Sequence, residues 1–484
     1  MLRALVACVG LLVALAVHAD VGCGDDQSRR DGDWWEPAPE APVRIDLTGY
    51  THVLRPAGHG RYEPIASALG RRRYPSQAQT MQFMAFFAPE SGQALYVQTQ
   101  VVDPVSIVDW ELGARELRLY FYDARQTDVI VDRSLAPRWQ AAAERYRSWS
   151  SKQFWAHRAR SSGKLSPRYI HFYGDNVFDD PWTERRVAPV LRAFSGSARP
   201  GTATFFVNWG YQGINVGAPF YDACPPEQAN CRRERDFRNF LTTLRDRFGS
   251  VPLPYTNASL WDGRQHNAAP TAQRAPGFLL RLAPTRSQQP TYLRYPQIGG
   301  KDRCLLVACP ASAAWRQAVR DVQLGIKDSR GRPTPGVYLD VATAMHPRLC
   351  YATDHGHAPG SPSAPVEGTR TMLRQALADH EYVMAEGAAE VYIDLVDSSL
   401  LYLGSASPAS VPLFAAVYGN LVDIVGWEMP EAARPADLCA AIERAEAFGV
   451  SAFGSPWMTR SDTSLQHSDS ILRDTCQLTR NPNR

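Results

Sequence analysis

The most chemically varied stretch of the sequence is residues 336–360, which read GVYLDVATAMHPRLCYATDHGHAPG. It begins with an apolar run typical of a buried strand, and that run ends on the carboxylic acid Asp340. Cys350, His355 and His357 follow in a segment interrupted by glycine and proline. Carboxylate, thiol and imidazole groups carry out acid–base catalysis and bind metal ions. The segment therefore has three readings: a catalytic edge, a metal site, or an ordinary polar loop.

The elements that must position these groups alternate between strands and helices. Seven apolar runs with strand character lie at residues 169–176, 203–212, 253–262, 336–341, 381–387, 421–428 and 449–457. Helical periodicity appears between most of them, at residues 235–248, 312–326, 368–380 and 437–448. Such alternation predicts a parallel β/α architecture. No glycine-rich phosphate loop follows the first strand, which disfavours a dinucleotide-binding fold. We therefore expect a (β/α)8 TIM barrel, irregular unless the tail after Trp457 supplies an eighth strand.

The part of the chain before this alternation has a β pattern. Two apolar runs flank Pro89-Glu90-Ser91-Gly92, a hairpin signal, and short strand-like runs follow at 117–124 and 128–132. Residues 43–135 are therefore predicted to form a β-sandwich-like domain. Apolar residues at helical spacing then predict an amphipathic helix over 138–156.

The N-terminus has the features of an export signal. Arg3 precedes an apolar run over residues 4–17, and small residues at Val17 and Ala19 mark a cleavage site. We expect a signal peptide over 1–19, a linker over 20–42, the β domain over 43–135, the barrel over 136–460 and a tail over 461–484. The predicted location is secreted or periplasmic, without stable membrane insertion, because no second long apolar run occurs.

Charge and cysteine content exclude some classes of function. The net charge of +3 is too small to indicate a nucleic-acid partner, and the run Arg71–Arg73 is expected to be solvated surface. Outside the leader an even number of cysteines remains, which favours disulfides, with Cys224–Cys231 and Cys439–Cys476 as the expected pairs. Because the chain has no CxxC pair, we expect no structural zinc site and no cofactor.

The residues at the predicted strand ends suit a carbohydrate. In a (β/α)8 barrel the active site lies at the C-terminal ends of the strands. Amides and acids hydrogen-bond sugar hydroxyls, and aromatic faces stack on sugar rings. We therefore expect an oligosaccharide, polysaccharide or glycoconjugate partner. The candidate binding residues at strand ends and on the following loop are Asp175, Asn208, Trp209, Asn257, Tyr351, His355, His357, Trp427 and Glu428.

Two acids stand out, Asp340 and Glu386, because they end adjacent strands and glycoside hydrolysis commonly uses a pair of carboxyl groups. Over roughly residues 138–457 the chain resembles a family of secreted, glycoside-hydrolase-like TIM-barrel proteins. That family is catalogued largely as a domain of unknown function, near the endo-α-N-acetylgalactosaminidases. The most specific motifs are "GVYLDV" followed by "CYATDHGH", together with "LPYTNASLWD" and "AEGAAEVYIDLVD". The resemblance implies that Asp340 is the nucleophile and Glu386 the acid/base.

Adjacent strand ends favour the short carboxyl separation of a retaining enzyme. In that mechanism the pKa of Glu386 should be raised while Asp340 stays ionised. Two alternatives remain. One is a non-catalytic carbohydrate-binding barrel. The other is a metal-dependent hydrolase in which His355 and His357 bind a metal with Cys350 or Asp354, although sugar binding or bracing of the loop is the preferred role for the histidines.

Overall fold

The computed structural model describes Pro39 and residues 41–157, 229–262, 303–402 and 408–427, together with short strands at 169–172, 202–205, 292–295 and 453–454. The predicted signal peptide and most of the predicted linker and tail lie outside the described residues. Among the described residues, no helix is both long enough and apolar enough to cross a membrane.

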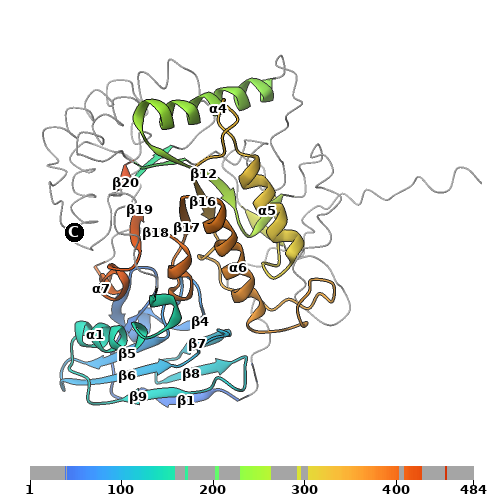
Figure 1. The fold of residues 1–484 in the computed structure, drawn as a ribbon. Helices are drawn as coiled ribbons and strands as arrows, with labels where there is room; N and C mark the ends of the chain where they lie inside the picture. Colours follow the sequence, from blue (N-terminus) through green and yellow to red (C-terminus); the bar gives the residue numbers. More distant parts are fainter. Residues whose placement is uncertain are drawn as a thin grey trace, which may run out of the picture.

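The N-terminal part contains two antiparallel sheets, drawn in blue at the base of Figure 1. One sheet has the order β1-β8-β7-β4 and consists of β1 (Val43–Asp46), β4 (Gly70–Tyr74), β7 (Val108–Leu112) and β8 (Glu116–Phe121). The other has the order β3-β2-β5-β6-β9 and consists of β2 (His52–Arg55), β3 (Arg61–Pro64), β5 (Phe83–Ala88), β6 (Gln93–Thr99) and β9 (Val129–Asp132). The predicted hairpin is confirmed, because β5 pairs with β6 from Phe83 opposite Gln98 to Ala88 opposite Gln93.

The prediction that Arg71–Arg73 is solvated surface was wrong. The run lies in β4, and Arg73 is only 1% exposed. Its Nε atom donates to Asp109 Oδ1 at 2.7 Å, and Arg71 also pairs with Asp109. A buried carboxylate needs such partners, because a charge out of water is costly when it is left uncompensated.

The second part of the chain contains a parallel sheet of eight strands in the order β19-β18-β17-β16-β12-β11-β10-β20. The strands are β10 (Tyr169–Phe172), β11 (Thr202–Phe205), β12 (Val251–Asn257), β16 (Gly336–Asp340), β17 (Tyr382–Glu386), β18 (Ser398–Tyr402), β19 (Asp423–Trp427) and β20 (Phe453–Gly454). Each of the seven predicted runs overlaps a strand of this sheet. The eighth was expected after Trp457 and is instead β18, which lies between β17 and β19.

Four of the described helices overlap predicted helical stretches with shifted ends, and a fifth, at residues 413–418, was not predicted. They are α1 (Trp139–Ser150), α4 (Ala229–Phe248), α5 (Ala313–Gly325), α6 (Ala364–Asp379) and α7 (Leu413–Tyr418), with 3-10 turns η2 (Ile65–Ser67), η3 (Phe154–Ala156) and η6 (Glu390–Leu395). Helix α1 ends before the predicted residue 156, and η3 follows it. Figure 1 shows α5 and α6 side by side, next to the central strands β16 and β17. The predicted helix at 437–448 lies outside the described residues.

An unpredicted insertion separates β12 from β16. It contains a three-stranded antiparallel sheet in the order β13-β15-β14, formed by β13 (Leu260–Asp262), β14 (Tyr292–Tyr295) and β15 (Arg303–Val307). The N-terminal part touches the segment that follows β16. Gln77 N donates to Ala344 O at 3.2 Å, and Arg73 Nη1 donates to Pro347 O at 3.1 Å. The antiparallel part of the chain therefore helps to fix the loop that begins after Asp340.

Candidate functional site

The predicted nucleophile Asp340 lies at the C-terminal end of β16 and is 6% exposed. The neighbouring strand β12 places Asn257 directly opposite it. Asn257 Nδ2 donates to Asp340 Oδ2 at 3.1 Å, and Tyr255 Oη donates to the same oxygen at 2.6 Å. Tyr338 Oη contacts the other oxygen, Oδ1, at 3.4 Å. These donors come from two neighbouring strands and hold the carboxyl group in one orientation.

Alternation along the two strands explains this arrangement. Successive side chains of a strand point to opposite faces, so residues two apart share a face. Tyr255 therefore shares a face with Asn257, and Tyr338 shares a face with Asp340. Neither tyrosine was among the predicted site residues. The period of two residues in "YTN" and "YLD" was a signal that could have found both.

The second predicted acid, Glu386, ends β17 and is 5% exposed. Its Oε2 atom accepts a hydrogen bond from the backbone N–H of Val341 at 2.8 Å. Val341 has a φ of 51°, which is rare for a β-branched residue and indicates local backbone strain. Gly387 follows with a φ of 83°, and a Cβ atom on it would lie 2.4 Å from Ala344 Cα. The strand end therefore requires glycine after Glu386.

The charge of the pair differs from the expectation. Burial, the charge of Glu386 and a side-chain hydrogen bond with Glu386 raise the pKa of Asp340 well above its usual value. The hydrogen bonds from Tyr255 and Tyr338 oppose this effect. We expected Asp340 to stay ionised, and its raised pKa runs against that expectation, because two buried carboxylates cannot readily ionise side by side. The expectation did not account for the burial of Asp340, which is about as complete as that of Glu386.

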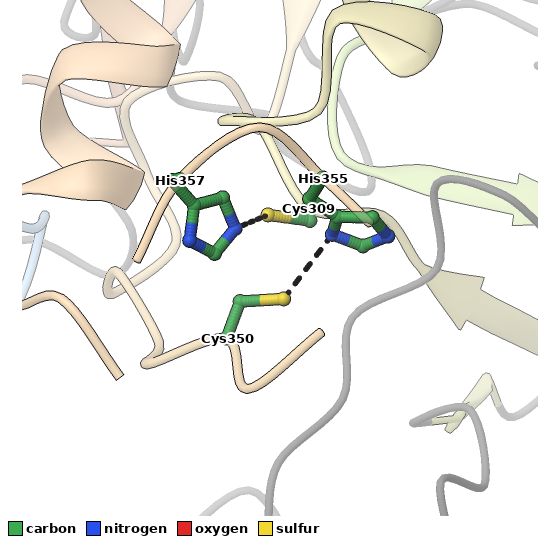
Figure 2. A group of neighbouring side chains, drawn as sticks. All are labelled: Cys309, Cys350, His355 and His357. Carbon is green, nitrogen blue, oxygen red and sulfur yellow. Dashed lines mark hydrogen bonds between the residues drawn. The ribbon is translucent and has the colours of Figure 1, made fainter. Parts of the chain in front are cut away.

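The loop after β16 carries the predicted residues Tyr351, His355 and His357. The Tyr351 ring lies close to Gly360, where a Cβ atom would be 2.7 Å from Tyr351 Cε1. His355 is buried and His357 is half-buried, and both lie with Cys309 and Cys350 in one cluster (Figure 2). No disulfide joins Cys309 to Cys350.

This cluster shows that ligands for a metal ion can come together without a CxxC pair, on which the expectation of no structural zinc site was based. The four ligand atoms lie within 4.8 Å of one another, an arrangement that could hold a metal ion. Cys309 follows β15, whereas the other three residues follow β16. A spacing rule cannot detect ligands that two separate loops bring together, so Cys309 was missed.

Several predicted residues are not described. Asp175, Asn208, Trp209 and Glu428 lie outside the described residues, and of Trp427 only its place at the end of β19 is given. The side chains of the predicted disulfide pairs Cys224–Cys231 and Cys439–Cys476 are likewise outside the description. The described site therefore consists of Asp340 and Glu386 with their donors, and the adjoining loop.

Comparison with known protein families places the chain. A family model described as "Domain of unknown function (DUF6259)" matches residues 126–429, more than half of the sequence. The chain belongs to the DUF6259 family. The match spans Asp340, Glu386 and the Cys/His cluster, so the whole described site lies inside the family domain.

A curated relative of this DUF6259 protein is named "Putative glycoside hydrolase" and comes from Bacteroides thetaiotaomicron. The two are 30% identical over 178 residues, which is 36% of this chain and 25% of the relative. The matched region thus spans only a quarter of that relative's length.

Among solved structures, the α-N-acetylgalactosaminidase NagBb from Bifidobacterium bifidum is similar in fold. The TM-score is 0.58 at 14% sequence identity, over 90% of this chain and 76% of NagBb. A variant of the GH36 α-galactosidase AgaA from Geobacillus stearothermophilus has a TM-score of 0.50 at 10% identity, over 90% of this chain and 63% of AgaA. The DUF6259 protein therefore shares its mixed α/β fold with glycosidases.

Proposed function

We propose that this DUF6259 protein is an exported glycoside hydrolase in which Asp340 is the nucleophile and Glu386 the acid/base. The observation that carries the proposal is the buried pair of carboxyl groups at the ends of adjacent parallel strands. The name of the curated relative and the fold shared with glycosidases support the same class of reaction. The substrate is a carbohydrate or glycoconjugate.

Glycoside hydrolysis by two carboxyl groups needs one proton on the pair at the start. In the first step of a double displacement, one carboxyl group attacks the sugar while the other gives a proton to the leaving oxygen. Burial and mutual repulsion favour a single shared proton, as the raised pKa of Asp340 indicates. Tyr255 and Asn257 donate to Asp340 and would stabilise negative charge there when the proton lies on Glu386.

Close contact of the carboxyl groups supports retention of the anomeric configuration. Retaining enzymes hold these groups about 5–5.5 Å apart, whereas inverting enzymes need roughly 6.5–9.5 Å to fit a water molecule. The charge of Glu386 contributes to the raised pKa of Asp340, as expected for two neighbouring carboxyl groups. Adjacent strand ends favour the shorter separation.

We further infer that the parallel strands close into a (β/α)8 barrel. The strands from β10 to β19 follow one another in chain order across the sheet, and β20, the last in the chain, pairs with β10. A return of the last strand to the first is the connectivity of a closed barrel. The active site then lies at the strand ends that carry Asp340 and Glu386.

The chemistry is tested by screening purified protein against aryl glycosides of different sugars and then measuring variants on the best substrate. Asp340→Asn should lower turnover by several orders of magnitude, because it removes the nucleophile. Glu386→Gln should lose far more activity on substrates with poor leaving groups than on activated aryl glycosides, which need little protonation. The exposed Glu144→Gln in α1 is the control and should match wild type.

The stereochemistry is read by NMR from the anomer formed first, which should keep the configuration of the substrate. An inverted first product would exclude the covalent intermediate. Binding of sugars without turnover of any substrate in the panel would instead support the non-catalytic alternative. Equal losses of Glu386→Gln on both substrate types would remove the acid role from Glu386.

A further inference from the structure

Two sulfur and two nitrogen atoms converge beside the candidate active site. Cys309 Sγ lies 3.4 Å from His357 Nε2, and Cys350 Sγ lies 3.3 Å from His355 Nδ1. All four ligand atoms lie within 4.8 Å of one another. Figure 2 shows the four side chains pointing toward a common centre from two loops.

The spacing of these atoms matches a tetrahedral zinc site. With Zn–S bonds of about 2.3 Å and Zn–N bonds of about 2.0–2.1 Å, tetrahedral angles separate sulfur from nitrogen by about 3.6 Å. The two observed sulfur–nitrogen separations are slightly shorter. Thiolate and imidazole ligands in a Cys2His2 set select zinc over the hard cations calcium and magnesium, which prefer oxygen.

The outer nitrogens of both imidazoles have partners, as expected for metal ligands. His357 Nδ1 lies 3.0 Å from Ala358 O, so this nitrogen carries the proton and Nε2 keeps its lone pair for a metal. His355 Nε2 faces Asp354 Oδ1 at 3.8 Å, which leaves Nδ1 directed toward Cys350. A carboxylate or carbonyl behind a histidine fixes the tautomer that binds a metal ion.

The backbone is shaped to bring the two histidines together. In a β-strand, two histidines separated by one residue would point to the same face. Here the His-Gly-His segment lies in a loop, so the backbone must bring the two rings together in another way. Gly356 has a φ of 78°, in the left-handed region that glycine adopts without strain, and the two rings lie 5.8 Å apart. Gly360 N then donates to Cys350 O at 2.8 Å and closes the loop on itself.

Burial makes the two thiols costly to ionise without a cation. Cys309 and Cys350 lie in a small apolar cluster with Leu260, Val307 and Ala352. A bound Zn²⁺ ion reverses this balance, because it binds thiolates and displaces their protons.

We propose that Cys309, Cys350, His355 and His357 bind one Zn²⁺ ion in a structural site. Four protein ligands fill a tetrahedral shell and leave no open position for a catalytic water molecule. The site joins the loop after β15 to the loop after β16. This reading differs from the metal-dependent hydrolase considered above, because the metal shapes the protein and takes no part in bond cleavage.

The zinc site also acts on the carboxyl pair through Val341. The Val341 side chain packs against the apolar cluster that contains Cys309 and Cys350, and its N–H donates to Glu386. The ion therefore helps to hold a strained residue next to Asp340. This consequence rests on the proposed glycosidase activity, whereas metal binding itself does not.

The test uses the full-length protein purified without chelator and begins with elemental analysis. We expect one equivalent of zinc in wild type and a loss of most of it in Cys309→Ser and in His357→Gln. The control is His52→Gln, in a strand of the N-terminal sheets, which should keep the metal. Exchange for Co²⁺ should give thiolate-to-cobalt charge-transfer bands and the absorption of tetrahedral cobalt.

A second measurement on wild type guards against variants that fail to fold. Alkylation followed by mass spectrometry should find Cys309 and Cys350 protected until a strong chelator is added, and the chelator should lower the melting temperature. A disulfide between Cys309 and Cys350 in the native protein, or metal content unchanged in Cys309→Ser, would overturn the site. These readouts need no substrate, so they succeed or fail independently of the glycosidase assay.

Discussion

Burial and three tyrosine hydroxyl groups have opposite effects on the pKa of Glu390. Replacing this carboxyl group therefore tests which effect is larger. The residue is fully buried and accepts hydrogen bonds from Tyr74, Tyr146 and Tyr418. The Tyr146 hydroxyl donates to both carboxylate oxygens at 2.7 Å. The three tyrosines come from β4, α1 and α7, so Glu390 joins the N-terminal sheets to the second part of the chain.

Burial outweighs the tyrosine hydrogen bonds and raises the pKa of Glu390 from 4.5 to about 7. Between these two values the folded protein holds a proton that the unfolded chain has lost. The free energy of unfolding contributed by Glu390 is therefore fully present below pH 4.5 and is lost as the pH rises through about 7. The difference in pKa corresponds to a total of about 3 kcal/mol.

The substitution Glu390→Gln mimics the protonated side chain in shape and charge but cannot titrate. We expect urea unfolding to give similar free energies for wild type and variant at pH 4, where Glu390 is mostly neutral in both the folded and the unfolded chain. At pH 8 the variant should gain about 3 kcal/mol relative to wild type. Glu144→Gln, which removes an exposed carboxylate from α1, controls for the change in net charge and should show little dependence on pH.

Parallel stability curves for wild type and Glu390→Gln across this range would show that the pKa of Glu390 is not raised. A variant that becomes less stable than wild type with rising pH would reverse the reasoning. In that case the three tyrosine donors outweigh burial, and Glu390 acts as a charged centre that holds the two parts of the chain together.

Two further predictions concern the candidate active site. Tyr255→Phe removes a 2.6 Å hydrogen bond that lowers the pKa of Asp340, so the acidic limb of the kcat/KM profile should move to higher pH. Tyr338→Phe removes a longer contact of 3.4 Å and should move that limb less. Equal profiles for the two variants would refute the argument. Gly387→Ala should lower the melting temperature strongly, because its Cβ atom would lie 2.4 Å from a backbone atom of Ala344. Gly331 also has a positive φ but has no atom within 4 Å of a Cβ position, so Gly331→Ala should cost only about 1–2 kcal/mol of backbone strain. Similar losses in the two variants would contradict the steric explanation.

Local patterns predicted the elements that position the carboxyl pair. Asp340 and Glu386 could be found because each ends a short apolar run, and such runs form the buried strands of parallel sheets. The strand β18 was missed because its run, Ser398–Tyr402, follows closely after η6 without a helix of ordinary length between. The alternation of strand and helix, on which the prediction depended, fails at that point.

Contacts between distant segments could not be predicted in the same way. The burial of Arg73 depends on Asp109 in a neighbouring strand, and a run of arginines gives no indication of such a partner. Cys309 lies near Cys350 although it follows β15 of the antiparallel insertion and Cys350 follows β16, and no local pattern indicates that contact. The raised pKa of Asp340 likewise depends on the distance between two carboxyl groups. Strand register determines the distance between the backbones of the two residues but not the distance between their side chains.

Val341 connects the separate parts of the described site. Its positive φ is unfavourable for a β-branched residue, so neighbouring contacts must hold it in place. Its N–H donates to Glu386, and its carbonyl accepts from Ser259 Oγ at 3.3 Å. Its side chain packs on the apolar cluster that contains Cys309 and Cys350. Because the residue immediately follows Asp340, one strained backbone conformation orients both carboxyl groups of the pair. The proposed zinc ion would help to hold that conformation, because two of its ligands, Cys309 and Cys350, lie in the cluster against which Val341 packs. A metal site near the two acids would then have a structural purpose, although the proposed glycosidase chemistry needs no metal.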